Sequence, residues 1–298
     1  MSLHSRLAIV SLRKSLTRYS LHRYKDGLAG KLSMSFMHMV FSFLTYFTSH
    51  ALSLATGSAQ EAGFQSYTVV NASVTALIPE GISFADASVL PLAIDTAAVG
   101  LYASEGFGLP LPSLDPKPLN KTIVVWGGSS SVGIVAIQLA VASGLNVITT
   151  ASKHNFSFVK DAGAAVAIDY KSSSVVEDVV EAVKKSGGDF AGVYDAISLP
   201  EDSYKFTVPI VEKLGGGPLA TVLPGPEDLP GTVKQYGVFG INALTHPIWA
   251  DYLTPALKSG KLQALPPPQV IGKGLESVQS GLDANKKGVS AKKVVIEL

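Results

Sequence analysis

Apolar and polar positions follow a regular alternation of two patterns over most of the chain. From residue 121 onward, short β-rich segments alternate with stretches that carry helical spacing; the β-rich segments are 122–126, 146–150, 165–168, 190–196, 219–223 and 291–298. Strands and helices that alternate in this way indicate a parallel sheet covered on both faces. We therefore predict an α/β fold with a doubly wound parallel sheet.

The segment before this alternation has a different pattern. Residues 64–70 are typical of a strand that continues through 71–79, where Pro79, Glu80 and Gly81 predict a turn. Residues 84–106 are mostly small and apolar, which predicts a helix interrupted near Pro91. The proline-rich stretch 109–121 predicts an extended, exposed connection.

The first 60 residues differ in composition from the rest. Residues 1–31 are rich in Lys and Arg and contain one acidic residue, Asp26, while 32–60 contain no Lys, Arg, Asp or Glu. Three interpretations stay open: a leader outside the fold, an organellar transit peptide, or a signal anchor formed by 32–48. Ser, Thr and His interrupt that apolar run, so it is a poor membrane span. We favour the leader, and with it a cytoplasmic protein that does not associate with membranes.

Charge and cysteine content exclude several classes of function. The formal net charge of the 298 residues is +1, which gives no argument for nucleic-acid binding. Cysteine is absent, which excludes disulfides, thiolate nucleophiles and cysteine-ligated zinc. We expect no metal site, and a small-molecule substrate rather than nucleic acid.

The strand at 122–126 runs into a glycine–serine turn and then directly into a helix. The turn has the sequence GGSSSVG, and its candidate ligand-binding residues are Gly127, Ser129, Ser130, Ser131, Val132 and Gly133. A strand–turn–helix of this kind directs free backbone N–H groups and the helix dipole at an anion such as a pyrophosphate. The turn therefore predicts dinucleotide binding, although a serine-capped helix without a ligand has the same pattern.

The next predicted strand indicates which dinucleotide binds. An NAD site places an acidic residue about 20 positions after the turn, to hold the ribose 2′-hydroxyl. Here the sequence has Ser152, Lys153, His154 and Asn155 instead, and Tyr170 follows the next strand. A hydroxyl and a cation favour a 2′-phosphate, so NADP(H) is the predicted cofactor. A solvated Lys153 is the simpler alternative.

These segments resemble the zinc-independent medium-chain dehydrogenase/reductases, and within them the fungal TOXD-like and trans-acting enoyl reductases. The resemblance rests on WGGSSSVGIVAIQLA, TASKHNFSFVKDAGA, AIDY and KKVVIEL, and it covers residues 63–298. It implies a central Rossmann domain at 96–261, clasped by a partial GroES-like β lobe at 61–95 and 262–298. Family members have further strands before this region, and we expect the chain to lack most of that lobe.

The resemblance also implies roles for individual residues. Ser129 to Val132 would contact the pyrophosphate, and Ser152 to Asn155 with Tyr170 would contact the adenosine 2′-phosphate. Leu223 and Phe239 would lie toward the nicotinamide, as would the candidate substrate residues Asp95 and Thr96.

The chemistry that the resemblance implies is reduction of an activated C=C bond of an enoyl thioester or enone, in fungal secondary metabolism. The substrate would be a small molecule or a carrier-bound acyl group, with a polyketide synthase as partner. No proton donor is assigned; Tyr102, Tyr236 and His246 qualify by residue type alone. Two alternatives stay open, a truncated NADP-binding protein without catalytic activity and a membrane-anchored reductase.

Overall fold

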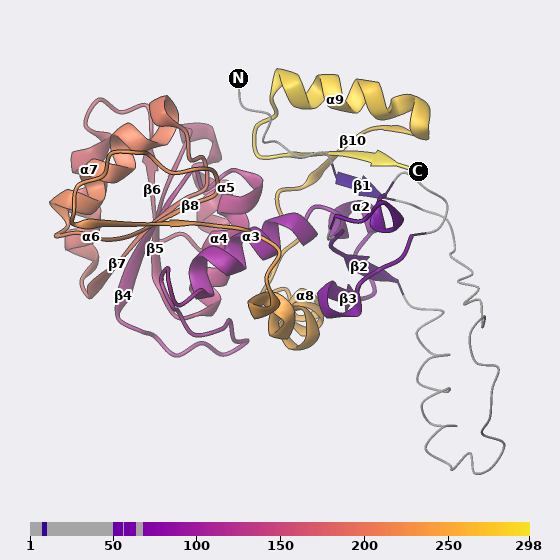
Figure 1. Ribbon diagram of the computed structural model, residues 1–298, viewed down its shortest axis with the longest axis horizontal. Coiled ribbons are helices and arrows are strands. Elements are labelled where there is room, and N and C mark those ends of the chain that lie inside the picture. The colour runs from indigo at the N-terminus through magenta and orange to yellow at the C-terminus, as the bar shows by residue number, and fades with distance from the viewer. Residues whose placement is uncertain (1–7, 11–49, 56, 64–67) are drawn as a thin grey trace, which may run out of the picture.

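A six-stranded parallel sheet with helices on both faces forms the larger part of the molecule (Figure 1). The computed structural model describes residues 8–10, 50–55, 57–63 and 68–298. The strands of this sheet are β4 (Lys121–Trp126), β5 (Asn146–Ala151), β6 (Val166–Asp169), β7 (Asp189–Asp195), β8 (Gly217–Thr221) and β9 (Val233–Gly237). Their order across the sheet is β6-β5-β4-β7-β8-β9, and all neighbouring pairs are parallel. The predicted doubly wound α/β fold is confirmed.

The central strand β4 shows how the sequence determines the two layers. Ile123 and Val125 point into one buried cluster, and Val124 and Trp126 point into the other. Successive side chains of a strand face opposite sides of a sheet, so a strand covered on both faces must be apolar at every position. This explains the uninterrupted run TIVVW.

Helices cover the two faces unequally. The helices of this part are α4 (Ser131–Ala142), α5 (Phe156–Asp161), α6 (Val175–Ser186) and α7 (Lys205–Lys213). On one face α6 and α7 pack their apolar stripes against the sheet. On the other face, α4 and α5 share a larger cluster with α3 (Pro91–Tyr102) and α8 (Leu253–Ser259). Because α4 has neighbours on two sides, it is apolar around most of its circumference.

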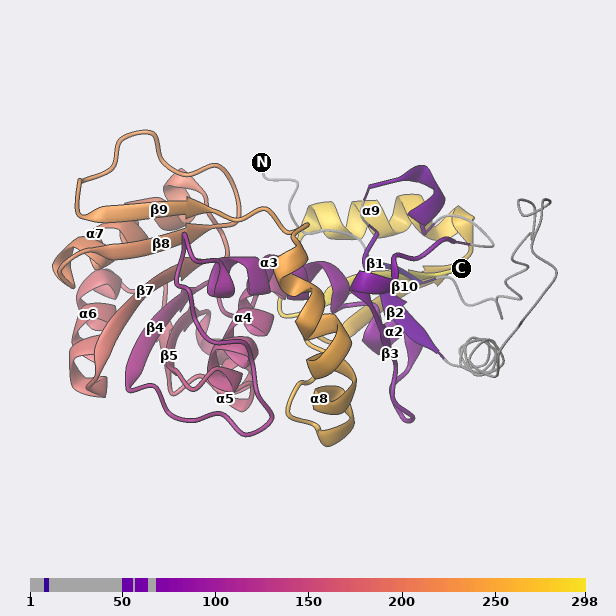
Figure 2. The ribbon, with the colours of Figure 1, turned by 60° about the horizontal axis from the view of Figure 1, so that its bottom comes forward.

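A smaller lobe is formed by both ends of the chain (Figures 1 and 2). Its elements are β1 (Ala8–Val10), β2 (Ala51–Ser53), β3 (Thr75–Leu77), α2 (Phe84–Ala87), β10 (Pro268–Lys273), α9 (Val278–Lys287) and β11 (Lys293–Glu297). The strands β1, β11 and β10 form one parallel sheet with β11 in the middle, and β2 pairs antiparallel with β3. In this lobe α9 lies along the sheet, and Figure 2 shows it beside β10.

Two predictions for the N-terminal region are corrected. The expectation that residues 1–60 stand apart from the fold is wrong for Ala51–Ser53, which pair with β3, and Leu52 and Leu54 are buried in the larger core cluster. The strand predicted over 64–79 is also too long, because within its described residues, 68–79, the strand is limited to Thr75–Leu77. The transit-peptide and signal-anchor interpretations, and residues 64–67, lie outside the described residues.

One described segment is long and apolar enough to cross a membrane by composition. It is Phe84–Tyr102, which comprises α2 and α3. In the structure most of this segment is buried, and α3 packs against α4 and the larger core cluster. Its apolarity is thus accounted for by packing between the sheet and the smaller lobe.

Candidate cofactor site

The turn between β4 and α4 has a backbone that only glycine permits. Gly127 has φ +77°, in the left-handed region. A Cβ on Gly133 would lie 2.3 Å from the Gly127 carbonyl oxygen, and a Cβ on Gly128 would lie 2.0 Å from Thr149 Oγ1. The turn is tied to β5, because the N–H of Gly127 donates to Thr150 Oγ1 at 3.0 Å. The glycines thus let helix α4 begin directly against the sheet.

Helix α4 begins with a serine cap and with free donors. Ser130 Oγ accepts a hydrogen bond from the Gly133 N–H at 3.0 Å. Within the described part of the chain, the N–H groups of Ser131 and Val132 have no acceptor. Unpaired N–H groups in the first turn of a helix, together with its dipole, favour an anion. Ser130 thus caps the helix, while Ser131 and Val132 keep backbone donors that a ligand could use.

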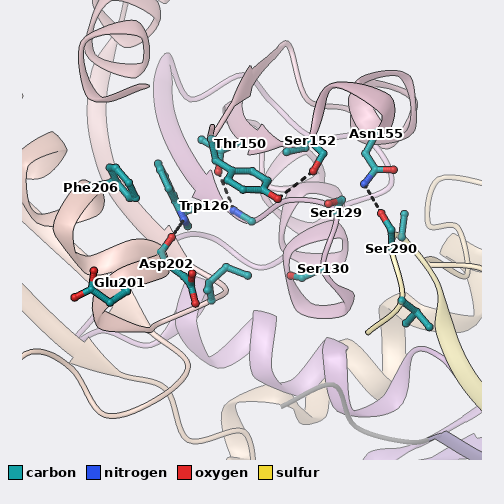
Figure 3. Close-up of a pocket in the computed structure, with 16 residues that line it drawn as sticks. Trp126, Ser129, Ser130, Thr150, Ser152, Asn155, Glu201, Asp202, Phe206 and Ser290 are labelled. Atoms are coloured by element: carbon teal, nitrogen blue, oxygen red, sulfur yellow. Dashed lines mark hydrogen bonds between the residues drawn. The ribbon is translucent and has the colours of Figure 1, made fainter. Parts of the chain in front are cut away.

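A cavity of about 620 Å³ opens at the carboxyl ends of β4, β5 and β7 (Figure 3). It lies at the point where the strand order reverses, which is where open α/β sheets bind ligands. The residues that line it are Trp126, Gly127, Ser129, Ser130, Thr150, Ala151, Ser152, Asn155, Tyr170, Ile197, Glu201, Asp202, Phe206, Val289, Ser290 and Ala291. The structure thus brings Gly127, Ser129, Ser130, Ser152, Asn155 and Tyr170 of the predicted set to one cavity.

The end of β5 carries the groups predicted to select the cofactor. Ser152 Oγ donates to the Tyr170 hydroxyl at 3.1 Å, which joins the ends of β5 and β6. Lys153 Nζ lies 3.9 Å from Asp169 Oδ2. The Lys153 side chain is 81% exposed, so it lies at the rim of the cavity. The search for an acidic residue about 20 positions after the turn did not find Asp169, because this carboxylate belongs to the next strand, β6.

The C-terminal segment supplies a second wall. Asn155 Nδ2 donates to Ser290 Oγ at 3.1 Å, and His154 Nε2 lies 3.1 Å from the same hydroxyl. Lys293 Nζ donates to Ser131 Oγ at 3.2 Å, and Lys293 is only 7% exposed. The turn of the sheet and the smaller lobe therefore meet at this site.

Sequence reasoning missed this wall. A signal was present, because the alternation of a strand puts Lys293 on the same face as Val295, which is buried. A lysine on the inward face of a strand needs an anionic or polar partner. Ser290, which precedes the strand, had no comparable signal.

The opposite end of the cavity is aromatic and acidic. The rings of Trp126 and Phe206 stack with their centroids 5.2 Å apart, and Trp126 Nε1 donates to the Asp202 carbonyl oxygen at 3.1 Å. Glu201 and Asp202 line the cavity at this end. Among the described lining residues none is a Lys, Arg or His, so the cationic side chains near the site, Lys153 at the rim and the buried Lys293, lie next to the lining.

Nine predicted residues are not part of the cavity lining: Ser131, Val132, Gly133, Lys153 and His154 are close in sequence to residues that line it, and four others lie elsewhere. Leu223 follows β8 and is half-buried, and Phe239 is 74% exposed. Thr96 Oγ1 donates to the Leu92 carbonyl oxygen within α3. Asp95 is buried in the core and accepts a hydrogen bond from Trp249 Nε1 at 2.7 Å. The prediction that the substrate contacts the Asp95 carboxyl does not fit this placement, because the side chain is turned into the protein.

Burial raises the pKa of Asp95 above its ordinary value. The hydrogen bond from Trp249 and the nearby Thr245 and His246 act in the opposite direction but are outweighed. Oδ2 of Asp95 has no hydrogen-bond partner within the described part of the chain.

The three candidate proton donors do not line the cavity. The Tyr102 hydroxyl is buried and lies within hydrogen-bond distance of Ser143 Oγ and the Leu139 carbonyl oxygen, and burial raises the pKa of this hydroxyl. Tyr236 and His246 are half-buried outside the cavity. The structure therefore adds no proton donor to the site.

Comparison with known proteins identifies the family. The family described as "Zinc-binding dehydrogenase" matches residues 131–206, which include α4 and the end of β5. "Dehydrogenase orsE" of Emericella nidulans is 46% identical over 262 residues, which cover 84% of this chain and 75% of that protein. "Trans-enoyl reductase himH" of Aspergillus japonicus is 42% identical over 255 residues, which cover 84% of this chain and 72% of that protein. The chain belongs to the medium-chain dehydrogenase/reductase family.

Solved structures of this family share the fold. The CurK enoyl reductase has a TM-score of 0.58 at 18% identity and covers 77% of this chain and 67% of its own. The structure of mycobacterial Rv1454c complexed with NADPH has a TM-score of 0.52 at 23% identity, with coverage of 75% and 68%. The resemblance to fungal trans-enoyl reductases is confirmed by sequence, and the Rossmann architecture by structure.

The family description names zinc, but this chain does not offer a zinc site in its described part. The sequence contains no cysteine. The described residues contain no group of three or more His, Asp or Glu placed to hold a metal ion. This medium-chain dehydrogenase/reductase therefore lacks, in its described part, the donor set that a protein zinc site requires.

Proposed function

We propose that this protein is an NADPH-dependent oxidoreductase that reduces an activated C=C bond of an enone or enoyl thioester. The observation that carries the proposal is the 620 Å³ cavity at the sheet's reversal point, with the glycine–serine turn as its floor. Its size is in the range of cavities that bury small-molecule cofactors. The trans-enoyl reductases among its relatives support the C=C substrate.

The residues present fit a dinucleotide at this cavity. The free N–H groups of Ser131 and Val132 and the buried ammonium group of Lys293 would hold the diphosphate. Lys153, His154 and Asn155 would hold the 2′-phosphate at the end of β5. The aromatic pair Trp126 and Phe206 gives an apolar wall for the adenine. When bound, the dinucleotide supplies the hydride for the reduction.

The protein's own residues would bind the dinucleotide and the substrate and orient them toward one another. Reduction at the β-carbon of an enoyl group builds negative charge on the carbonyl oxygen, which needs a hydrogen-bond donor. No described side chain near the cavity is placed as an obligatory acid, so solvent would deliver the proton. A carrier-bound acyl substrate of a polyketide synthase in fungal secondary metabolism fits this chemistry, and we propose a cytoplasmic location.

A titration paired with a turnover assay tests the proposal. NADPH is titrated by its fluorescence, and the same sample is assayed for NADPH oxidation with a panel of enones and enoyl thioesters. We expect saturable binding and oxidation that depends on the C=C substrate. Binding without turnover would favour the catalytically silent alternative, and a folded protein that does not bind NADPH would refute the cofactor site.

A further inference from the structure

The segment between β9 and α8 is held at both of its ends. At one end, the Val238 N–H donates to the Thr221 carbonyl oxygen at 2.8 Å, which continues the pairing of β9 with β8. At the other end, Trp249 Nε1 donates to Asp95 Oδ1 on α3 at 2.7 Å. Figures 1 and 2 show this segment running from β9 past α3 to α8. The hydrogen bond from Trp249 therefore ties the segment to α3.

Helix α3 gives this hydrogen bond a fixed acceptor. The Tyr194 hydroxyl, on β7, donates to the Thr96 carbonyl oxygen at 2.9 Å. A Cβ on Gly100 would lie 2.3 Å from Tyr194 Cε2, so the helix lies directly against that ring. Asp95 and Trp249 are each 1% exposed. The contact is thus buried, and its acceptor is anchored to the central sheet.

A carboxyl is a costly side chain at this position. Oδ2 of Asp95 has no hydrogen-bond partner among the described residues, and an unpaired buried polar atom destabilises a fold. The neighbours of Asp95 in the helix, Ile94, Ala98 and Val99, are buried and apolar. Apolar contacts have no preferred direction, whereas a short N–H···O bond fixes the position of the donor. The carboxyl therefore contributes to the position of Trp249 rather than to stability.

The middle of the segment presents two apolar side chains to solvent. Phe239 is 74% exposed and Ile241 is 48% exposed. Gly240 between them lies against α3, because a Cβ there would be 3.1 Å from Thr96 Oγ1. The backbone of the segment is thus fixed against the helix while the side chains on either side of Gly240 point away from the core.

These side chains lie at the edge of the sheet that carries the cavity. All strands of the sheet are parallel, so residues that follow β9 emerge at the same edge as the cavity at the ends of β4, β5 and β7. In the strand order, β9 is on the opposite side of β4 from β5 and β6, where the groups predicted for the 2′-phosphate lie. Three strand spacings, about 14 Å, separate β9 from β4. The segment is therefore on the side where the substrate would bind.

We propose that Asp95 is a positioning residue. Through Trp249 it holds residues 239–248 against α3, so that Phe239 and Ile241 contact the apolar acyl chain of the substrate. This inference rests on the proposed reductase function and deepens it, because it assigns a substrate with an extended apolar chain beyond the C=C bond. Covering exposed apolar side chains with such a chain removes apolar surface of both from water, which favours longer acyl groups.

Two thioesters that differ only in chain length test the proposal. The probes are the N-acetylcysteamine thioesters of 2-butenoic and 2-decenoic acid, assayed by NADPH oxidation with the full chain. Asp95→Leu removes the acceptor, and Trp249→Phe removes the donor but keeps an aromatic ring in the core. We expect each to raise KM for the decenoyl thioester about tenfold, the factor expected for one buried hydrogen bond. The kcat, the KM for the butenoyl thioester and the dissociation constant of NADPH should stay unchanged.

Three further variants separate positioning from general stability. Asp95→Asn keeps the acceptor and should restore the parental KM. The double variant of Asp95→Leu and Trp249→Phe should be no worse than either alone, because both remove the same bond. Thr254→Val is the matched control; it removes another hydrogen bond of this junction, to the Leu77 carbonyl oxygen at 2.9 Å, and should behave like the parent.

Hydrogen exchange gives a measurement that does not depend on turnover. Exchange of residues 239–248 should quicken in Asp95→Leu and not in Asp95→Asn. Equal loss with both thioesters, a fall in NADPH affinity, or unchanged KM and exchange in Asp95→Leu and Trp249→Phe would overturn the inference and leave the proposed function intact. A parent protein that binds NADPH but oxidises it with no enoyl thioester or enone would overturn both.

Discussion

The six-stranded sheet and the smaller lobe differ in how completely their strands are covered. In the central strands β4 and β5 five of six residues are buried. In the smaller lobe four of five residues of the central strand β11 are buried, but none of its neighbour β10. Three of the large apolar side chains that are exposed, Val270, Leu275 and Leu282, lie in this lobe on or near β10 and α9. The sheet is thus a closed, two-sided core, while among the described residues the smaller lobe is covered on fewer sides.

The candidate cofactor site lies at the boundary between these two regions. Its floor is the turn after β4, which belongs to the closed core, and its outer wall is the segment 289–291 from the smaller lobe. Local opening of a protein starts where apolar contacts are few. We therefore expect changes in the turn to abolish the site and changes in the wall to adjust its affinity.

The largest effect is expected for Gly133→Ala. The added Cβ would lie 2.3 Å from a backbone oxygen of Gly127, and neither group can move without displacing α4 from the sheet. We expect loss of detectable NADPH binding and a destabilisation of about 2–4 kcal/mol, typical of overpacking in a core. Fluorescence titration and urea unfolding measure the two quantities. Gly231→Ala, where nothing lies within 4 Å of the added atom, should change neither. A Gly133→Ala protein that binds normally would contradict the described turn.

The second effect concerns the cation that the smaller lobe contributes. Lys293→Met keeps the aliphatic stem but removes the ammonium group next to Ser131. We expect the affinity for NADPH and NADH to fall equally, by about ten- to hundredfold, since charged hydrogen bonds contribute about 1.5–3 kcal/mol. The exposed Lys292→Met is the matched control and should bind as the parent does. A fall for NADPH alone would place Lys293 at the 2′-phosphate instead.

A third prediction uses two buried carboxyls, one between the two regions and one within the sheet. Burial raises the pKa of Asp95, whose carboxyl accepts a hydrogen bond from Trp249 Nε1 at 2.7 Å. Burial also raises the pKa of Asp195, but this carboxyl accepts from two backbone N–H groups and from Thr207. A raised pKa in the folded state gives stability that is complete below the unfolded pKa. That stability is lost as the pH rises through the folded pKa.

Asp95→Asn should therefore stabilise the protein at neutral pH, by about 1 kcal/mol, because it removes a buried charge and keeps the acceptor for Trp249. The gain should shrink as the pH falls toward the unfolded pKa of an aspartate. Asp195→Asn should instead destabilise the protein by about 1–2 kcal/mol, because it weakens three hydrogen bonds. Urea unfolding across the acid range measures both. An Asp95→Asn gain that does not depend on pH would contradict the raised pKa of Asp95.

Local pattern predicted the sheet better than it predicted the smaller lobe. The structure of the run TIVVW and of the turn after it is predictable from these residues alone, because Gly127 and Gly133 are required wherever a helix begins that close to a strand. The strand predicted over 64–79 was too long because β3 is limited by its pairing with β2. The strand β2 lies in the first 60 residues, whose composition differs from the rest, so the sequence did not indicate this partner. Apolar residues such as Val69 and Val70 have strand propensity, but both are exposed.

The site was predictable only where it is local in sequence. Ser129 and Ser130 follow directly from the strand–turn–helix pattern and Ser152 from the end of the next strand, and the structure places all three in the cavity lining. Ser290 and Lys293 reach the site from more than 130 residues away. Asp95 was predicted to lie near the substrate. In the structure its side chain instead points into the core, where it accepts a hydrogen bond from Trp249.

The smallest effect is expected at the rim, where Asp169 faces Lys153. The two groups are 3.9 Å apart and Lys153 is 81% exposed, so the ion pair adds little to stability. Its relevance is to selectivity, because Asp169 neutralises the cation that a 2′-phosphate would meet. We expect Asp169→Asn to raise the preference for NADPH over NADH by about twofold, and Lys153→Ala to lower it several-fold. Both changes should fade at high salt, since the groups are near the surface. Unchanged ratios of the two dissociation constants in Lys153→Ala would leave the 2′-phosphate to His154 and Asn155.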